Sequence, residues 1–345
     1  MKTPLYLWLV LALILALTAG CYREEAIEGQ YADEYYVRHA GADLPVWVRG
    51  NRQARSFIIY LHGGPGASAL PDALTRSLRD VTDYYPVVFY DQRLSGYAHG
   101  VRNGDSLSID QMTEDLAVVI RFIEQQYAPA HIFLMGHSWG GFLGTAFLAE
   151  PAYRAMITGW VEVAGAHSFP VTWAAERAVV KPWADSMLAL GEDTKRWQAY
   201  VDWHERTPTL ETLDDLLFVN GYAHSIDGKP GAQAAYDGPS LTWALSSPIA
   251  PTSSQRLIIR GLAADLITTD PLTPLMPTIT TPTLLIYGRH DAVVPVAVGR
   301  HAYDNLGTAP ADKTLVIMEE EGHDTWRVTP QRFAGHIRDF IARYE

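Results

Sequence analysis

Short, continuous apolar runs alternate with amphipathic stretches along most of this chain. The runs are rich in β-branched and aromatic residues, and they cover residues 55–61, 86–90, 131–135, 157–163, 282–287 and 314–318. Runs without polar alternation are typical of strands that are buried on both faces. Strands of this kind separated by helices predict an α/β fold with a mainly parallel sheet and helices on both sides.

Two of the intervening stretches have a clear helical period. Apolar residues recur at spacings of three and four from Ile109 to Ile123, and again from Phe333 to Tyr344. Ser108 followed by Gln111 predicts a capping box at the first helix. Thr329 followed by Pro330 predicts an N-cap and first residue for the second helix.

The alternation of strand and helix stops between residues 166 and 275. Five of the ten tryptophans lie in this interval, and Pro and Gly interrupt its helical stretches. We expect a largely helical cap inserted over the sheet, with ordinary connecting helices as the alternative. The predicted organisation is a signal peptide (1–20), a first core part (21–165), the cap (166–275) and a second core part (276–345).

The first residues have the pattern of a targeting signal. Lys2 precedes an uncharged stretch whose apolar core, Leu5–Leu17, is shorter than the ~20 residues that span a membrane. The only cysteine, Cys21, follows at the position where a bacterial lipobox has its acylated residue, although Thr18 replaces the usual leucine. This resemblance implies an exported lipoprotein anchored to the cell envelope through Cys21, with the outer membrane favoured if the cell is Gram-negative. An uncleaved anchor and an ordinary secretory signal are the alternatives.

Composition narrows the functional classes. The 345 residues are 48% apolar, and 27 basic against 39 acidic residues give a net charge of −12. An acidic chain without a basic patch argues against nucleic-acid binding and against electrostatic binding to anionic lipid. A single cysteine excludes an intrachain disulfide framework and a thiolate zinc cluster.

The most specific chemical motif is the sequence Gly136-His-Ser138-Trp-Gly-Gly141. It lies between a predicted strand and a predicted helix, which is the context of a nucleophile elbow. The tight turn exposes the serine hydroxyl above the sheet edge, and the helix N-terminus favours negative charge there. We therefore expect Ser138 to be a catalytic nucleophile.

A serine hydroxyl needs a base to accept its proton. Asp291 and His323 follow the last two predicted strands, in the order Ser, Asp, His that this kind of site uses. We expect His323 to be the general base and then general acid, and Asp291 to orient its imidazole. Asp265 and Asp270 are weaker candidates for the acid because no strand precedes them.

Other histidines lie near these motifs. His137 and His62 are inside tight turns and are expected to shape them, while His290 adjoins Asp291 and would point elsewhere. His301 and His336 are predicted to lie on helix surfaces.

The oxyanion formed during acyl transfer needs two backbone donors. One is expected to be the N–H of Trp139, directly after the nucleophile, and the other comes from the turn His62-Gly-Gly64-Pro65-Gly66. Pro65 has no N–H, so Gly64 is preferred to Gly63.

The motifs His62-Gly-Gly-Pro-Gly66, Asp91-Gln-Arg93 and Gly136–Gly141 together resemble the proline iminopeptidase family of α/β-hydrolases. The resemblance covers about residues 44–163 and 282–345. It implies an α/β-hydrolase fold and a serine exopeptidase that releases an N-terminal residue, typically proline, from short peptides. It implies neither a metal nor an organic cofactor.

Two features depart from that family. Leu94 stands where the family has a glycine after Asp-Gln-Arg, and the cap has no clear motif for the substrate ammonium. Glu205, after Trp203, and Glu162 are possible ammonium partners, although structural roles are the alternative for both. No residue is assigned to ammonium binding.

Three functions are compatible with the sequence. The first is an exported aminopeptidase that acts on short peptides through an acyl-enzyme. The second is a carboxylesterase or lactonase that uses the same triad on small esters, since a fold does not fix a substrate. The third is a non-catalytic binding lipoprotein that uses the cleft under the cap.

Overall fold

The computed structural model describes residues 29–74, 78–100, 107–228, 261–262 and 269–345. The predicted signal peptide and Cys21 lie outside these residues, as does Asp265, so those interpretations stay predictions. In the part of the chain that is described, no helix is both long and apolar enough to cross a membrane.

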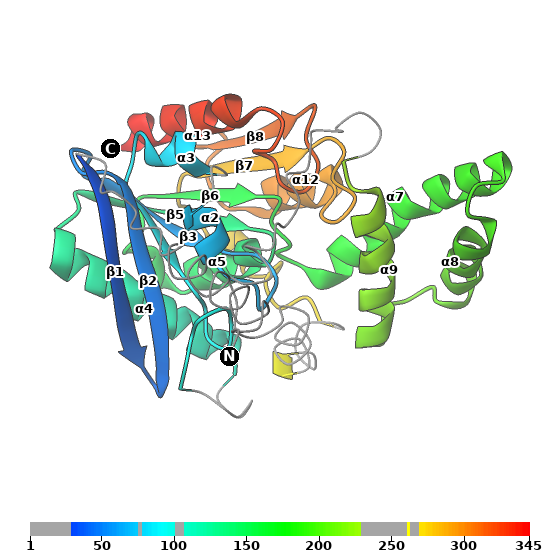
Figure 1. The fold of residues 1–345 in the computed structure, drawn as a ribbon, viewed down its shortest axis with the longest axis horizontal. Helices are drawn as coiled ribbons and strands as arrows, with labels where there is room; N and C mark the ends of the chain where they lie inside the picture. The colour runs from blue at the N-terminus through cyan, green and yellow to red at the C-terminus, as the bar shows by residue number, and fades with distance from the viewer. Residues whose placement is uncertain (1–28, 75–77, 101–106, 229–260, 263–268) are drawn as a thin grey trace, which may run out of the picture.

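An eight-stranded sheet forms the centre of the molecule (Figure 1). Its spatial order is β1-β2-β4-β3-β5-β6-β7-β8, and all neighbours from β4 to β8 are parallel. The strands are β1 (Gln30–His39), β2 (Ala42–Asn51), β3 (Ser56–Leu61), β4 (Val87–Tyr90), β5 (His131–His137), β6 (Gly159–Val163), β7 (Thr283–Gly288) and β8 (Lys313–Met318). The six predicted strands and the mainly parallel sheet are confirmed.

The first two strands form an antiparallel hairpin that the sequence analysis did not predict. Their register runs from the pair Gln30 and Asn51 to the pair His39 and Ala42, and β2 continues antiparallel onto β4. β1 is the edge of the sheet, and almost none of its residues is fully buried. A half-exposed edge strand lacks the continuous apolar run that marked the inner strands.

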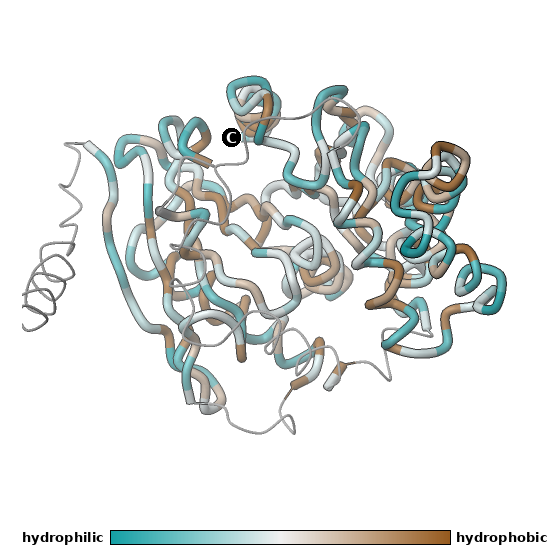
Figure 2. The backbone as a smooth tube through the Cα atoms, turned by 45° about the vertical axis from the view of Figure 1, so that its right-hand side comes forward, coloured by the Kyte–Doolittle hydropathy of each residue, from teal (hydrophilic) through white to brown (hydrophobic). Residues whose placement is uncertain are grey.

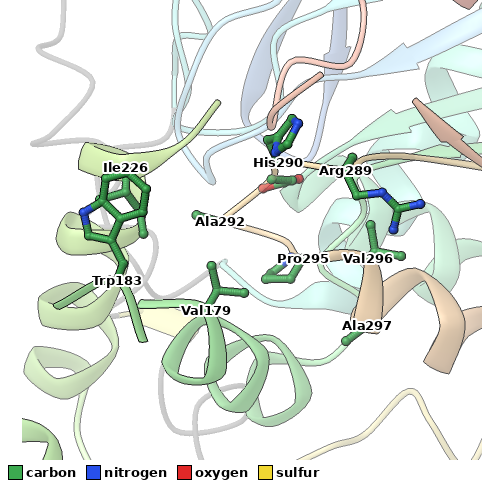
Figure 3. A pocket seen from close by; sticks show the side chains of 10 residues that line it. Val179, Trp183, Ile226, Arg289, His290, Ala292, Pro295, Val296 and Ala297 are labelled. Carbon is green, nitrogen blue, oxygen red and sulfur yellow. The ribbon is translucent and has the colours of Figure 1, made fainter. Parts of the chain in front are cut away.

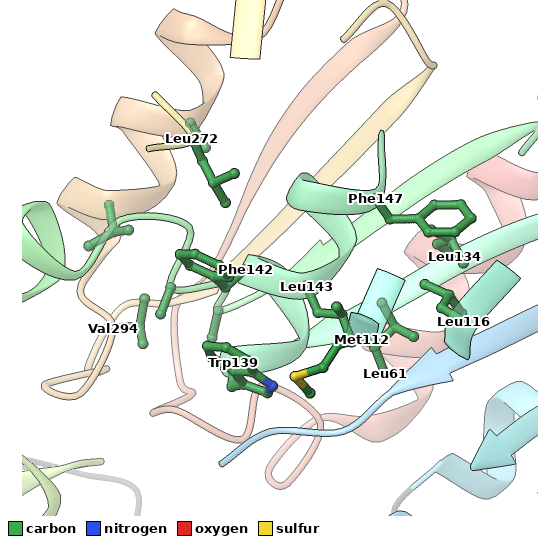
Figure 4. Close-up of a cluster of buried hydrophobic side chains, with 14 of the residues drawn as sticks. Leu61, Met112, Leu116, Leu134, Trp139, Phe142, Leu143, Phe147, Leu272 and Val294 are labelled. Atoms are coloured by element: carbon green, nitrogen blue, oxygen red, sulfur yellow. The ribbon is translucent and has the colours of Figure 1, made fainter. Parts of the chain in front are cut away.

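Each face of the sheet is covered by its own hydrophobic cluster. In β3, Phe57, Ile59 and Leu61 belong to one cluster, and Ile58 and Tyr60 to the other, because successive side chains point to opposite faces. The helices of the first cluster are α4 (Ile109–Tyr127), α5 (Trp139–Ala149) and α12 (Val296–Asn305), and those of the second are α3 (Arg79–Thr82) and α13 (Pro330–Tyr344). Figure 4 shows α5 side chains packed in the first cluster, and Figure 2 shows hydrophobic segments gathered at the centre of the molecule.

The two predicted helix caps have different outcomes. Ser108 Oγ accepts a hydrogen bond from Gln111 N at 3.1 Å, as expected, but the Gln111 side chain donates to Glu114 instead of returning to Ser108. Thr329 does precede Pro330 at the start of α13, but its hydroxyl donates to Glu321 at 2.9 Å and does not cap the helix. Ser108 as N-cap of α4, Thr329 as N-cap of α13 and Pro330 in its first turn are confirmed, while the reciprocal half of the capping box at Ser108 is not formed.

Three longer helices occupy the predicted cap interval. They are α7 (Phe169–Leu190), α8 (Thr194–Arg206) and α9 (Leu213–Ile226), and they lie beyond the carboxyl ends of β6, β7 and β8 (Figure 1). The remaining short helices are α2 (Leu70–Leu74), α6 (Pro151–Arg154) and η3 (Met276–Thr278). The limits of the cap at residues 166 and 275 stay a prediction.

Candidate active site

The three predicted catalytic side chains follow neighbouring strands at one edge of the sheet. Ser138 follows β5, Asp291 follows β7 and His323 follows β8, with β6 between the first two strands. Ligands of open α/β sheets bind beyond this carboxyl edge. The topology therefore gathers residues that are far apart in the sequence.

Ser138 has an unusual backbone conformation. Its φ is 56° and its ψ is −118°, which a residue with a Cβ atom adopts at a cost of about 1–3 kcal/mol. Three backbone hydrogen bonds hold it: Ser138 N donates to Val163 O at 3.0 Å, and Ser138 O accepts from Gly141 N at 2.9 Å and from Ala166 N at 3.0 Å. The side chain is partly exposed, so the hydroxyl can be reached.

The glycines of the elbow are required by close packing. A Cβ atom on Gly140 would lie 2.0 Å from Leu61 O, and one on Gly136 would lie 2.3 Å from Gly140 O. Neither backbone atom can move without displacing a strand or a helix. The spacing of glycines around Ser138 is therefore a steric consequence of the turn.

Asp291 and His323 form a buried pair. His323 Nδ1 is 3.0 Å from Asp291 Oδ2, and Asp291 Oδ1 accepts from Val293 N and Val294 N at 2.8 and 2.7 Å. Both oxygens of the carboxylate are thus occupied, and a proton on Nδ1 leaves Nε2 as the acceptor. This is the tautomer that a general base for Ser138 requires.

The charge around His323 favours its protonated form. Burial lowers the pKa of His323, but the carboxylates of Asp291, Asp227 and Asp324 together outweigh burial and raise the pKa to about 9. A general base acts only when it is unprotonated. The rate of acyl transfer should therefore increase with pH across the neutral and mildly alkaline range.

No hydrogen bond joins Ser138 and His323, both of which the structure describes. Their segments are nevertheless adjacent, because His137 packs against His323 with ring centres 4.8 Å apart and its Nε2 lies 3.2 Å from His323 O. Catalytic hydrogen bonds in unliganded enzymes are often long and tighten when substrate binds. The structure brings Asp291 and His323 into contact and places Ser138 beside them.

The glycine turn after β3 lies against the nucleophile. A Cβ atom on Gly63 would be 3.2 Å from Ser138 Cβ. His62 Nε2 accepts from Gln92 N at 3.1 Å, so its Nδ1 carries the proton and donates to Gly63 O at 2.8 Å. Since C=O and N–H point in opposite directions in a trans peptide, fixing Gly63 O also fixes the direction of the Gly64 N–H. This geometry favours Gly64 as an oxyanion donor.

The Asp91-Gln92-Arg93 segment connects the two turns that carry the proposed oxyanion donors. Gln92 donates to His62 O at 3.0 Å and accepts from Trp139 Nε1 at 2.8 Å. Arg93 is fully buried and forms two hydrogen bonds with Asp115, at 2.8 and 2.7 Å. Sequence analysis missed Asp115, because a single acid inside a helix has no motif.

Leu94, the departure from the family pattern, has a φ of 59°. The backbone therefore keeps the left-handed conformation that a glycine adopts without strain, at a cost of roughly 1–2 kcal/mol for leucine.

The two acids considered for ammonium binding have other surroundings. Glu205 is exposed on α8. Glu162 is fully buried, accepts a hydrogen bond from Tyr287 Oη at 2.8 Å and packs beneath Gly165. Glu162 Oε2 has no hydrogen-bond partner among the described residues, but its Oε1 is already engaged by Tyr287 and lies 3.5 Å from His167 Nδ1.

A different acid of the cap, Glu176, is within electrostatic influence of Asp291 and His323. It is fully buried in α7, and its Oε1 accepts from Asn220 of α9 at 2.8 Å. Its Oε2 has no hydrogen-bond partner among the described residues. Burial raises the pKa of Glu176 well above its usual value, and the charges of Asp291 and His323 act on it as well. Sequence reasoning missed Glu176 because burial of one acid in a helix leaves no motif.

A cavity of about 310 Å³ lies next to Asp291, between the cap and the loop after β7 (Figure 3). Its walls are mostly apolar: Val179, Trp183 and Ile226 from the cap, and Ala292, Pro295, Val296 and Ala297 from the core, with Arg289 and His290 beside them. Ser138 does not line it. Within the described residues, no group of three or more His, Cys, Asp or Glu side chains is arranged to hold a metal ion.

Comparison with known proteins decides the family. The family described as alpha/beta hydrolase fold matches residues 57–325. The chain belongs to this family. Among relatives of this alpha/beta hydrolase, a proline iminopeptidase of Saccharolobus solfataricus is 26% identical over 90% of this chain and 92% of that protein. The predicted resemblance to proline iminopeptidases is confirmed.

Esterases are also similar to this alpha/beta hydrolase. A pimeloyl-[acyl-carrier protein] methyl ester esterase of Vibrio campbellii is 25% identical over 83% of this chain and 94% of that protein.

The crystal structure of a Mycobacterium smegmatis proline iminopeptidase superposes with a TM-score of 0.63 at 18% identity, over 90% of this chain and 98% of that chain. The fold is therefore shared, and the substrate has to be argued from the site.

Proposed function

We propose that this protein is a serine hydrolase of the proline iminopeptidase type, which releases an N-terminal residue, proline, from short peptides. Ser138 Oγ attacks the first carbonyl carbon while His323 Nε2 takes its proton. His323 then protonates the leaving amine, and the peptide bond breaks to give an acyl-enzyme. Water deprotonated by His323 releases the acid and restores Ser138. The N–H groups of Gly64 and Trp139 are the proposed donors to the oxyanion.

The observation that carries the peptide assignment is the free oxygen of Glu176. A substrate with a free N-terminus has an ammonium group one carbon from the reacting carbonyl, and an ammonium needs an anionic partner in a dry site. Burial raises the pKa of Glu176 and so favours the uncharged form of its carboxyl group. An incoming cation favours the carboxylate form, so binding of the substrate ionises the partner that it needs.

An esterase that uses the same triad is the second candidate. The similarity to the Vibrio campbellii methyl ester esterase supports it, because that relative covers most of the chain at nearly the same identity. An ester substrate without an amine has no need of Glu176. The two functions therefore differ in how they depend on this one side chain.

The substitution Glu176→Gln separates the candidates. We expect it to lower kcat/KM for proline-naphthylamide by about 30-fold or more, since losing one partner of a buried charge pair costs roughly 2–5 kcal/mol. Hydrolysis of nitrophenyl acetate should change little. Glu205→Gln, on the exposed face of α8, is the matched control and should behave like the wild type.

Comparing substrates with free and blocked amines tests the peptide assignment. Cleavage of proline-naphthylamide but not of acetyl-proline-naphthylamide is the result expected of an aminopeptidase. Equal activity on the blocked amide, or activity on the ester alone that is insensitive to Glu176→Gln, would contradict the peptide assignment and favour the esterase.

A further inference from the structure

The end of cap helix α9 is hydrogen-bonded to the two loops that carry Asp291 and His323. Asp227, the residue after α9, accepts hydrogen bonds from Ala292 N at 3.2 Å and from His323 N at 3.1 Å. The next residue, Gly228, donates from its N–H to His290 O at 3.1 Å. Two consecutive cap residues thus contact the backbone on both sides of Asp291 and the backbone of His323 itself.

The carboxylate of Asp227 is shared between loops that belong to different strands. Ala292 follows β7 and His323 follows β8, and they are 65 and 96 positions from Asp227 in the sequence. The approach is close, because a Cβ atom on Gly322 would lie 2.8 Å from Asp227 Oδ2. The side-chain bond between Asp291 and His323 depends on the spacing of these two backbones, and Asp227 bridges them.

Asp227 also raises the pKa of His323. It is one of three carboxylates that raise the pKa of His323 against the effect of burial, together with Asp291 and Asp324. Three other titratable groups interact with the imidazole: His137, His224 and Glu176. Desolvation and the charge of His323 lower the pKa of both histidines to about 4. Burial raises the pKa of Glu176. The two histidines are uncharged at neutral pH, so the three carboxylates are the groups that raise the pKa of His323.

We propose that Asp227 is a positioning residue, which holds the Asp291 and His323 loops in register and makes the end of α9 part of the catalytic assembly. The inference rests on the proposed acyl-transfer function. It goes beyond that function by assigning the cap a role in the geometry of the catalytic pair as well as in substrate binding. The chemical steps are unchanged, since Asp227 touches neither the substrate nor the reacting atoms.

The test uses Asp227→Asn in the full chain. The amide keeps one acceptor oxygen, but it loses the charge and turns an NH₂ group toward a backbone N–H. We expect kcat for nitrophenyl acetate and proline-naphthylamide to fall about tenfold or more, with KM nearly unchanged. The midpoint of the rise of kcat/KM with pH should move down by about one unit, because a negative charge beside His323 is lost.

Two further variants make the result specific. Asp227→Glu keeps the charge but displaces the carboxylate by one methylene, so we expect the wild-type pH midpoint with a reduced kcat. Asp214→Asn removes an exposed acid from the first turn of the same helix and should leave both quantities unchanged. If Asp227→Asn does not fold, the kcat of Asp227→Glu tests the positioning role. A kcat equal to that of the wild type in Asp227→Glu would overturn it.

Labelling by a fluorophosphonate distinguishes failure of this inference from failure of the proposed function. If the wild type is active and labelled at Ser138, while Asp227→Asn keeps its kcat and its pH midpoint, the role of Asp227 is overturned and the function stands. If the wild type itself is neither labelled nor active, the proposed function fails and this inference fails with it.

Discussion

At the residue scale, the strained conformation of Ser138 links stability to chemistry. A hydroxyl presented at a positive φ of 56° is exposed to substrate, and the surrounding hydrogen bonds and glycine contacts hold it there. Backbone strain of this kind occurs at functional sites, where it positions a reactive group at a cost in folding stability. The elbow should therefore be more stable without the serine side chain.

We predict that Ser138→Gly increases the free energy of unfolding by about 1 kcal/mol while abolishing turnover. Glycine removes the steric cost of the positive φ, which is about 1–3 kcal/mol. The entropy that glycine adds to the unfolded chain opposes folding by only ~0.5–1 kcal/mol, so the net effect is stabilising. Ser138→Ala keeps the strain and is the matched control, with no turnover and near wild-type stability. Denaturant titration measures the difference, and equal stabilities for the glycine and alanine variants would contradict the strain argument.

Single residues also show how far sequence reasoning reaches. Ser138, Asp291 and His323 could be predicted because each follows a strand and stands in a recognisable order. Glu176 and Asp227 could not be predicted, since a lone acid in or after a cap helix has no pattern of its own. Their roles depend on which backbone or cavity the cap brings them to, and that is a tertiary property.

At the scale of elements, helix α4 ends on a residue that is poorly suited to its conformation. Ala128, the C-cap, has φ 44° and ψ 55°, is exposed, and is followed by Pro129. Glycine is the preferred residue at a left-handed helix end because it has no Cβ penalty. The sequence alone gives no sign of this strain, since alanine is an ordinary residue of helices.

We predict that Ala128→Gly stabilises the protein by about 0.5–1 kcal/mol, as the relief of left-handed strain exceeds the entropy that glycine adds to the unfolded chain. Activity should not change, because α4 ends far from the carboxyl edge of the sheet. Ala130→Gly, two residues further on and also exposed, is the comparison and should be neutral or destabilising. A lower midpoint of unfolding for Ala128→Gly than for the wild type would refute this reading of the helix end.

Elements differ in how well their sequence predicts them. The inner parallel strands were predictable because burial on both faces demands uninterrupted apolar runs. The hairpin β1–β2 was missed because its outer strand is half-exposed and its polar residues break the run. Only half of the predicted capping box forms: Ser108 Oγ accepts from Gln111 N, while the Gln111 side chain donates from Nε2 to Glu114 along the helix.

At the scale of the whole molecule, the site is assembled from two layers that contribute different properties. The sheet edge supplies the nucleophile, the base and the oxyanion turn, and the cap supplies Glu176 and Asp227. Gln92 connects the two turns and Arg93 ties this segment to Asp115 of α4, while Asp227 of the cap is proposed to hold the catalytic loops in register. Substrate choice is left to the cap, whose sequence carries the weakest pattern.

The most direct test of the account is whether Ser138 becomes the acylated residue. Full-length protein is treated with a fluorophosphonate, and intact mass and peptide mapping locate the adduct. The account predicts one adduct per chain, on Ser138, with no adduct and no turnover in Ser138→Ala. An adduct on another residue, or turnover that persists in Ser138→Ala, would contradict it.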